Sequence, residues 1–288
     1  MPNLGVTLID FLQRKNRERL AKYRQRKRQY SGQGLAVLAT MKNESTNLDE
    51  WMTHYFQVGA DRIVLIDNGS TDDSLKRAEA WLKTGKVEVL SYPAQHRQLE
   101  HYWAAYRRFV AGRHEWLLIA DMDEFWFCPD GTTIAEKLAD PNFDCIDVIY
   151  ANWRMFGSSG LVRHPESIRI GFVHCAPRLD SHKNTKFICR ASALRHSGNL
   201  GIHKVKGADS SRTVSDNEAF HLNHYPIQSR EFFQQVKMTR GDALSRMSDT
   251  VRDMEYFRRY DEPCILEDRT LSELVKNGRL GAKNAQSF

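Results

Sequence analysis

The sequence lacks several features that would assign it to a familiar class of protein. Its 288 residues include no apolar run as long as a membrane-spanning helix and no visible signal peptide. The cysteines are scattered and odd in number, and none belongs to a Cys-x-x-Cys pair, which argues against a disulfide scaffold and a cysteine zinc site. The cysteines are Cys128, Cys145, Cys175, Cys189 and Cys264. We therefore expect a cytoplasmic protein with reduced thiols.

Acidic residues are nearly absent from one N-terminal segment, where basic residues gather. Residues 14–28 contain nine lysines and arginines but only one acid, Glu18, while the whole chain has a net charge of +6. We expect residues 1–30 to form a basic helical arm that lies on an anionic membrane surface, or else packs on its own domain or a partner chain. Nucleic acid is the weakest alternative, because no aromatic platform or nucleic-acid-binding motif accompanies the charge.

Four short apolar runs alternate with helical patterns through the next part of the chain. The runs cover residues 35–40, 62–67, 87–90 and 116–120, and one amphipathic segment separates each run from the next. A single helix between successive strands is typical of right-handed β-α-β units. The pattern predicts an α/β fold with a mostly parallel sheet flanked by helices.

Polar residues gather where three of these strands end. Thr40, Asp67 and Asp121 close three of the runs, and parallel strands place their carboxyl ends at one edge of the sheet, where ligands bind. Asp123 and Glu124 follow Asp121, and neighbouring carboxylates repel one another unless a bound cation or a partner supplied by the fold relieves them. Oxygen ligands favour Mg²⁺ or Mn²⁺. The motif predicts a metal–diphosphate site, and the alternative is an acidic turn that caps a following helix.

The second half of the chain is less regular. We expect a strand at residues 145–150 and an edge strand, near phosphate, at residues 183–188. Short strands and long loops are predicted for residues 158–220, and helices for the part after Ser229. His224 belongs to a second polar cluster, residues 221–225, which could take part in the chemistry of the site.

Several polar segments follow the predicted strands in a fixed order, namely residues 42–44, 66–72 and 121–125. Their order and spacing resemble the nucleotide-sugar half of GT-A glycosyltransferases, and in particular the family 2-like and family 92-like branch. Residues 153–158 and 224–229, followed by Lys237 and Gly241, strengthen the family 92-like assignment. The resemblance covers residues 34–242 and leaves the basic arm outside.

The resemblance implies a GT-A, Rossmann-like sheet with an acceptor-side α+β region. Asp121 and Asp123 would then hold a divalent metal, Mn²⁺ or Mg²⁺, on the diphosphate of a nucleotide-sugar, with Asp123 the better ligand. Asp67 or Asn68 would touch the base or the ribose. Many relatives have Asp at the position of Asn68, and an amide can still hydrogen-bond a base, so the identity of the base stays open.

Further donor-side roles follow from the same resemblance. Lys42 and Glu44 would belong to the donor site, with Glu44 at the mouth of the base pocket. Negative charge develops on the leaving nucleoside diphosphate and must be stabilised. Lys186 could assist the metal in this, and Lys183 and Arg190 are alternatives.

An inverting transfer also needs a general base on the acceptor side. Glu218 is the first candidate and Asp216 the second, with Glu166 and Glu124 as further acids that could serve. Each of these could equally be an ordinary surface acid. His224 could be a late metal ligand, since imidazole suits Mn²⁺, or a core histidine.

These interpretations combine into one domain scheme and one leading function. The scheme has a basic arm (1–30), a nucleotide-sugar half (34–150), an acceptor half (151–242) and a helical C-terminal extension (243–288). The expected function is metal-dependent, inverting transfer from a UDP-sugar to a glycan or glycolipid such as lipopolysaccharide core or capsule, on the inner face of a cell membrane. The alternatives are a nucleic-acid-binding protein and a nucleotidyltransferase of sugar phosphates. The latter would need a Gly- and Arg-rich phosphate loop directly after the first strand, which this chain lacks.

Overall fold

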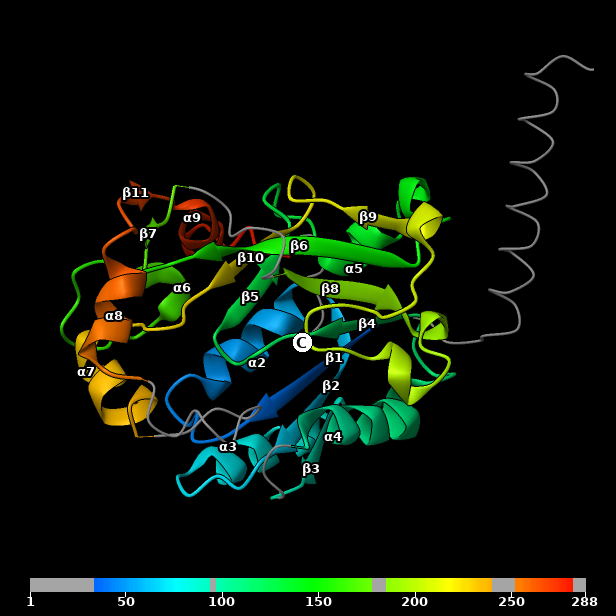
Figure 1. Cartoon of the computed structure of the whole chain (residues 1–288), viewed down its shortest axis with the longest axis horizontal. Helices are drawn as coiled ribbons and strands as arrows, with labels where there is room; N and C mark the ends of the chain where they lie inside the picture. Colours follow the sequence, from blue (N-terminus) through cyan, green and yellow to red (C-terminus); the bar gives the residue numbers. More distant parts are fainter. Residues whose placement is uncertain (1–33, 94–96, 178–184, 240–251, 282–288) are drawn as a thin grey trace, which may run out of the picture.

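The first half of the chain forms parallel strands joined by helices, as its alternating pattern predicts. The computed structural model describes residues 34–93, 97–177, 185–239 and 252–281, so the predicted arm of residues 1–30 lies outside the described residues (Figure 1). The predicted strands are β1 (Leu35–Met41), β2 (Ala60–Asp67), β3 (Val87–Ser91) and β4 (Trp116–Ile119). The helices between them are α2 (Leu48–Gln57), α3 (Ser74–Ala80) and α4 (Gln98–Ala105), which continues as the π-helix η2 (Tyr106–Val110). Since β1, β2, β3 and β4 pair in parallel, the predicted α/β class is confirmed.

Helices cover both faces of this sheet because the residues of β1 alternate between two hydrophobic cores. Leu35, Val37 and Ala39 face the core that contains α2, whereas Ala36 and Leu38 face the core that contains α4. Figure 1 shows α2 and α4 on different sides of the strands. Full burial of a large apolar side chain contributes about 1.5–3 kcal/mol, so a strand buried on both faces is strongly held in place.

The remaining strands extend the sheet with mixed directions. The order is β3-β2-β1-β4-β8-β6-β10-β5, and β9 pairs with β6. β8 runs antiparallel to both β4 and β6, and β10 runs parallel to β6 and antiparallel to β5. The added strands are β5 (Glu124–Phe127), β6 (Val148–Met155), β8 (Thr185–Arg190), β9 (Thr213–Ser215) and β10 (His221–His224).

One sequence-based expectation about local structure is wrong, and one alternative is excluded. The segment at 183–188 contributes to β8, which lies in the middle of the sheet and not at an edge, because Phe187 and Ile188 enter the two different cores. No helix follows Asp121, so the helix-capping alternative fails. The chain turns and enters β5, whose residues are fully buried and mostly aromatic, a composition that favours a strand.

The part of the chain after Ser229 packs against residues 158–175. It contains α7 (Arg230–Phe232), the π-helix η7 (Phe233–Lys237), α8 (Met254–Asp261) and α9 (Thr270–Lys276), so the helical prediction for this part is confirmed for the described residues. A small second sheet pairs β11 (Leu266–Glu267) with β7 (His174–Cys175). Figure 1 shows α7 and α8 close together at one end of the molecule. The shorter helices are α5 (Ile134–Leu138) and α6 (Ile168–Gly171), with 3₁₀ turns η1 (Leu82–Thr84), η3 (Pro141–Phe143), η4 (Ala191–Ala193), η5 (Ser197–Asn199) and η6 (Ser210–Arg212).

The strand directions bring many chain segments to one edge of the sheet. β1, β2, β4, β6 and β10 all end at this edge, and the antiparallel strands β5 and β8 begin there. We call it the carboxyl edge. The domain boundary predicted between residues 150 and 151 falls inside β6. Among the described helices, none has the length and apolar character needed to cross a membrane.

Candidate active site

A buried lysine from the centre of the sheet holds Asp121. Lys186, near the start of β8, donates from Nζ to Oδ2 of Asp121 at 2.7 Å, and the same Nζ lies 3.5 Å from Oε1 of Glu124. The Lys186 side chain is completely buried, whereas that of Asp121 is 36% exposed. A buried ammonium group is costly unless it is paired. Lys186 therefore serves as an internal counter-ion for both acids, below the surface of the site.

Glu124 fixes the turn between Asp121 and β5. It is fully buried; its Oε1 accepts from Nε1 of Trp153 at 2.8 Å, and its Oε2 accepts from the backbone N–H of Asp121 at 2.9 Å. Burial raises the pKa of Glu124 to about 8, although the Lys186 ammonium opposes the shift. Both oxygens of Glu124 are thus engaged inside the protein, and these bonds hold the turn that carries Asp121.

Asp123 faces two basic side chains from late in the chain. Lys237, the last residue of η7, donates from Nζ to Oδ2 of Asp123 at 2.5 Å, and Nε2 of His224 lies 3.5 Å from Oδ1. Burial alone would raise the pKa of Asp123, but the Lys237 ammonium and His224 outweigh burial and hold that pKa well below its usual range. Asp123 is therefore ionised, as a metal-binding carboxylate must be.

The spacing of Asp123 and His224 fits two neighbouring ligands of one metal ion. Ligand atoms about 2.1 Å from an ion and at right angles to each other lie about 3 Å apart, which is close to the 3.5 Å between Oδ1 and Nε2. No group of three or more His, Cys, Asp or Glu able to hold an ion occurs within the described ranges. Two protein ligands, Asp123 and His224, suit an ion whose other ligands are phosphate oxygens and water. Lys186 bonds one oxygen of Asp121, just as Lys237 bonds one oxygen of Asp123, and the oxygen that faces His224 belongs to Asp123.

The summed charge of the cluster formed by Asp121, Asp123, Glu124, Lys186 and Lys237 also favours a divalent cation. Asp121, Asp123 and Glu124 contribute three carboxylates, against the two ammonium groups of Lys186 and Lys237. The ionised cluster is therefore net negative, and protonation of Glu124 would leave it neutral. Neither state attracts a diphosphate by itself, whereas one divalent cation makes the cluster positive.

An aromatic side chain from β6 lies against His224. The ring of Trp153, on β6, is 4.2 Å from that of His224 and 5.5 Å from that of His203, measured between centroids. Trp153 is only partly buried. A flat apolar surface therefore borders the Asp123–His224 pair.

The residues predicted to hold the nucleoside lie in two bonded loops at the carboxyl edge. Asp67 is 3% exposed and accepts from two backbone N–H groups of its own loop, at 3.1 and 3.3 Å. Asn43, in the left-handed region at φ +53°, accepts at 2.8 Å from the backbone of the same loop and so ties it to the loop that carries Lys42 and Glu44. Asn68 and Glu44 are buried. Their nucleoside-binding roles stay predictions.

The two acids predicted as general base lie apart from this cluster. Asp216 and Glu218 belong to the loop between β9 and β10, which leads into the end of β10 that is farther from His224. Oδ1 of Asp216 accepts from the backbone N–H groups of Glu218 and Ala219, at 3.1 and 2.8 Å, so Asp216 stabilises its own loop. Glu218 is exposed. The structure therefore brings together Asp121, Asp123, His224 and Lys186 but not these two acids.

Sequence reasoning assigned no role to two members of the cluster. Trp153 and Lys237 were notable only as parts of motifs, and they bond to acids that lie 29 and 114 residues away in the chain. The only available signal was their position in segments that resemble family 92. Nothing in their local sequence indicates the contact.

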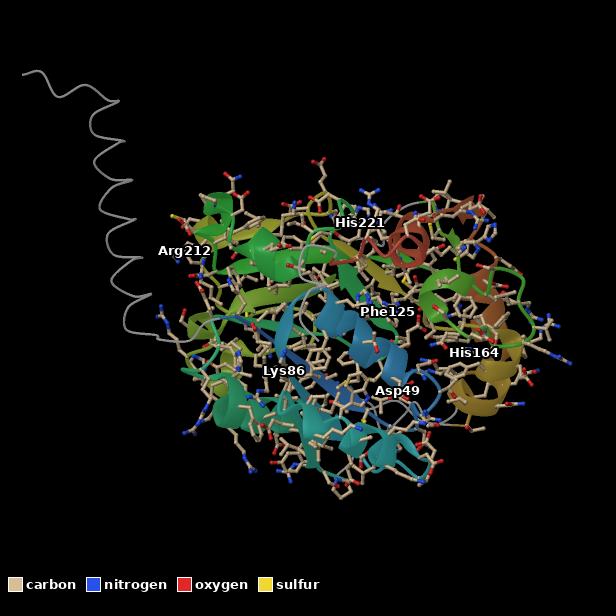
Figure 2. The ribbon with its side chains drawn as sticks, turned by 180° about the vertical axis from the view of Figure 1, so that it is seen from behind. Asp49, Lys86, Phe125, His164, Arg212 and His221 are labelled. Carbon is tan, nitrogen blue, oxygen red and sulfur yellow. The ribbon has the colours of Figure 1, made fainter. Side chains whose placement is uncertain are left out.

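A separate cavity lies at the opposite edge of the sheet and is structural in character. It has a volume of about 660 Å³, and its lining includes Arg190 and Arg212. Arg212 forms two bonds to Asp147, at 2.6 and 2.7 Å, while Arg190 pairs with Glu115. Figure 2 labels Arg212 at the end of the molecule away from His164. These pairs neutralise the arginines, so the cavity is not a strong site for an anion.

Comparison with solved structures gives distant similarities. Staphylococcus aureus TarS (residues 1–349), in a complex with UDP-GlcNAc, is 15% identical with a TM-score of 0.42, over 88% of this chain and 73% of that one. Mycobacterium tuberculosis glucosyl-3-phosphoglycerate synthase, with Mn²⁺ and UDP-glucose, is 15% identical with a TM-score of 0.40, over 72% and 73%. Neither similarity bears on the role of an individual residue.

Sequence comparison gives the family. A glycosyltransferase family 92 protein of Ricinus communis is 25% identical over 210 residues, which cover 70% of this chain and 37% of that protein. One of Oryza sativa subsp. japonica is 24% identical over 204 residues, which cover 69% and 34%. The match thus spans little more than a third of these relatives. The model of glycosyltransferase family 92 matches residues 37–261, most of the chain. The chain therefore belongs to glycosyltransferase family 92, and the predicted resemblance is confirmed.

Proposed function

We propose that the chain transfers a sugar from a nucleotide-diphosphate donor, a UDP-sugar, to a glycan acceptor with the help of a divalent cation. The observation that carries the proposal is the pair of Asp123 Oδ1 and His224 Nε2, 3.5 Å apart, at the edge where the loops after β1, β2 and β4 converge. Ligands of open α/β sheets bind at such an edge. Family membership agrees with sugar transfer.

Each residue of the cluster has a distinct part in this proposal. Asp123 and His224 hold Mn²⁺ or Mg²⁺, and the bound cation stabilises the charge that develops on the leaving nucleoside diphosphate. Lys186 and Glu124 fix the turn that carries Asp121 and Asp123. Preorganisation of this kind matters because small displacements of charged groups are costly for catalysis.

The nucleoside part of the donor would lie against the loops after β1 and β2. Asp67 and Asn68 are proposed to contact the base or ribose, with Lys42 and Glu44 beside them. The bonds that hold Asp67 fix the direction of its carboxylate before a nucleotide arrives. UDP is our first choice of nucleotide, and direct comparison with GDP and CMP tests it.

The acceptor is proposed to be a glycan or glycolipid, such as lipopolysaccharide core or capsule, and the transfer to be inverting. An inverting transfer needs a carboxylate to take the acceptor proton, and Glu218 and Asp216 are the first to be tested. If either is the base, its replacement by alanine should abolish transfer and leave UDP binding intact. If both alanine variants still transfer the sugar and the anomeric configuration of the product is inverted, another carboxylate is the base. Nuclear magnetic resonance of the product gives the anomer.

We further propose that the chain is cytoplasmic and binds the inner face of a cell membrane through the basic arm of residues 1–30, which lies outside the described residues. Co-sedimentation with anionic vesicles tests this. Deletion of the arm should abolish sedimentation and leave nucleotide binding unchanged. Loss of nucleotide binding in the deletion would instead make the arm part of the donor site.

Calorimetry of nucleotide binding is the decisive test of the donor site. UDP, GDP and CMP are titrated into the protein with and without Mn²⁺, for the wild type, Asp123→Ala and the surface control Asp130→Ala. We expect one nucleotide to bind only with Mn²⁺, with binding lost in Asp123→Ala and kept in Asp130→Ala. A folded wild-type protein that binds none of the three nucleotides in either condition contradicts the proposal.

A further inference from the structure

Lys237 occupies an unusual position for a lysine. It is 1% exposed and ends η7, the π-helix that follows α7. The wider π-helical turn is closed by the backbone bond from Met238 to Phe233 at 2.9 Å. π-helical turns are rare and occur often at functional sites. The local backbone therefore departs from the α-helix at the point where it directs an ammonium group to Asp123.

Helix α8 supports η7 in this conformation. The ring of Phe233 packs against Phe257 at 5.2 Å and against Tyr256 at 6.0 Å, measured between centroids. Phe233, Phe257 and Ile227 form a small hydrophobic core of their own. Lys237 is thus held by packing as well as by its ion pair, and its place beside Asp123 does not depend on a bound ligand.

The ion pair divides the two oxygens of Asp123. Oδ2 accepts from Nζ of Lys237 at 2.5 Å, while Oδ1 faces Nε2 of His224 at 3.5 Å. A cation between Oδ1 and Nε2 would therefore lie close to a fixed positive charge that shares its carboxylate. Like charges at short range in a buried site repel strongly. Lys237 must weaken the hold of Asp123 and His224 on a cation that arrives alone.

A nucleoside diphosphate changes this balance, because its negative oxygens can offset both positive charges. We propose, building on the donor site proposed above, that Lys237 makes binding of the divalent cation depend on the nucleotide, so that the two ligands load together. Two ligands that each improve the affinity of the other are coupled, and the coupling is reciprocal. Lys237 thus acts through Asp123 and lowers the affinity of the site for the metal ion in the absence of the nucleotide.

The test measures metal binding and not catalysis. Free Mn²⁺ is followed by electron paramagnetic resonance as it is titrated into the wild type and Lys237→Met, with and without UDP. For the wild type, UDP should tighten Mn²⁺ binding about tenfold or more, within the usual range of coupling between sites. Lys237→Met should bind Mn²⁺ about tenfold more tightly without UDP, and UDP should then improve that binding much less.

Matched variants separate a coupling role from a structural one. Lys237→Arg keeps the charge and should keep the coupling, and Lys206→Met, at an exposed lysine, should behave as the wild type. Lys237→Gln provides a second neutral variant should Lys237→Met fail to give the wild-type melting transition in EDTA. Unchanged Mn²⁺ affinity without UDP in a folded neutral variant overturns the inference while leaving the donor site intact. A wild type that binds neither Mn²⁺ nor UDP overturns the proposed function itself.

Discussion

Replacement of Lys186 by methionine should destabilise the protein in a way that grows with pH. Lys186 is completely buried and is bonded to Asp121 and Glu124 at 2.7 and 3.5 Å. Methionine keeps most of the apolar stem and removes the charge, which leaves the buried carboxylate of Glu124 without its counter-ion. Breaking a buried pair on one side costs about 3–5 kcal/mol. Asp121 contributes less to this cost, because it is partly exposed and can be hydrated.

The pH dependence follows from the titration of Glu124 in the metal-free protein. Its pKa of about 8 in the folded state lies above its ordinary value of 4.5. A carboxyl group with a raised folded pKa contributes stability that is complete below the unfolded value and is lost as the pH rises through the folded value. Lys186 opposes this rise, so Lys186→Met moves the folded pKa higher. The variant should therefore continue to lose stability above pH 8, by up to about 1.4 kcal/mol per pH unit.

Urea unfolding in EDTA at pH 6.5 and pH 9 measures the effect, since the free energy of unfolding extrapolates linearly from the denaturant series. At pH 6.5 Glu124 is largely protonated in the wild type, and a loss of about 1–3 kcal/mol is expected. At pH 9 the loss should reach about 3–5 kcal/mol. The control is Lys137→Met, which breaks the exposed 2.5 Å pair with Asp130 and should cost less than about 1 kcal/mol at both pH values. An equal loss for Lys186→Met at both pH values would refute the assignment of Lys186 as the counter-ion of Glu124.

Three further predictions concern stability. Trp153→Phe keeps an aromatic ring and removes the N–H donor at 2.8 Å from Glu124, so thermal unfolding should show a loss of about 1.5–3 kcal/mol. Gly281→Ala should lower the free energy of unfolding, measured in urea, clearly more than Gly85→Ala does. Both glycines have positive φ, but a Cβ at Gly281 would lie 2.0 Å from the carbonyl oxygen at the end of α2, whereas one at Gly85 would meet no atom within 4 Å. Burial and a neighbouring guanidinium lower the pKa of His221 to about 4, so its contribution to stability is complete above pH 6.5 and is lost as the pH falls towards 4. His221→Gln should therefore flatten the fall of the urea midpoint between pH 6.5 and pH 4. An unchanged dependence of the midpoint on pH in this variant contradicts the prediction.

The parallel half of the sheet could be predicted because its signals are local. Each buried strand is a short apolar run, and each intervening helix has its own amphipathic period. Once four strands alternate with helices, right-handed connections leave few arrangements, and Thr40, Asp67 and Asp121 must share an edge. The same reasoning correctly predicted that the polar loops converge. It could not predict β8 as a central strand, because neighbouring strands in a mixed sheet can come from any part of the chain.

The acidic motif shows most clearly what local sequence cannot supply. Three carboxylates within four residues need positive charge, and the sequence left two sources open, a bound cation or a partner from the fold. The structure supplies both ammonium partners from far away, because Lys186 and Lys237 lie 65 and 114 residues after the acids they bind. Lys186 arrives through the antiparallel insertion of β8, and Lys237 through a π-helical turn supported by α8. Even so, these two lysines do not fully neutralise the three acids when all are ionised, because Asp121 and Glu124 share Lys186 while Lys237 pairs with Asp123. In the proposed function a divalent cation supplies the missing positive charge, and Lys237 sets how strongly that cation binds before the nucleotide arrives.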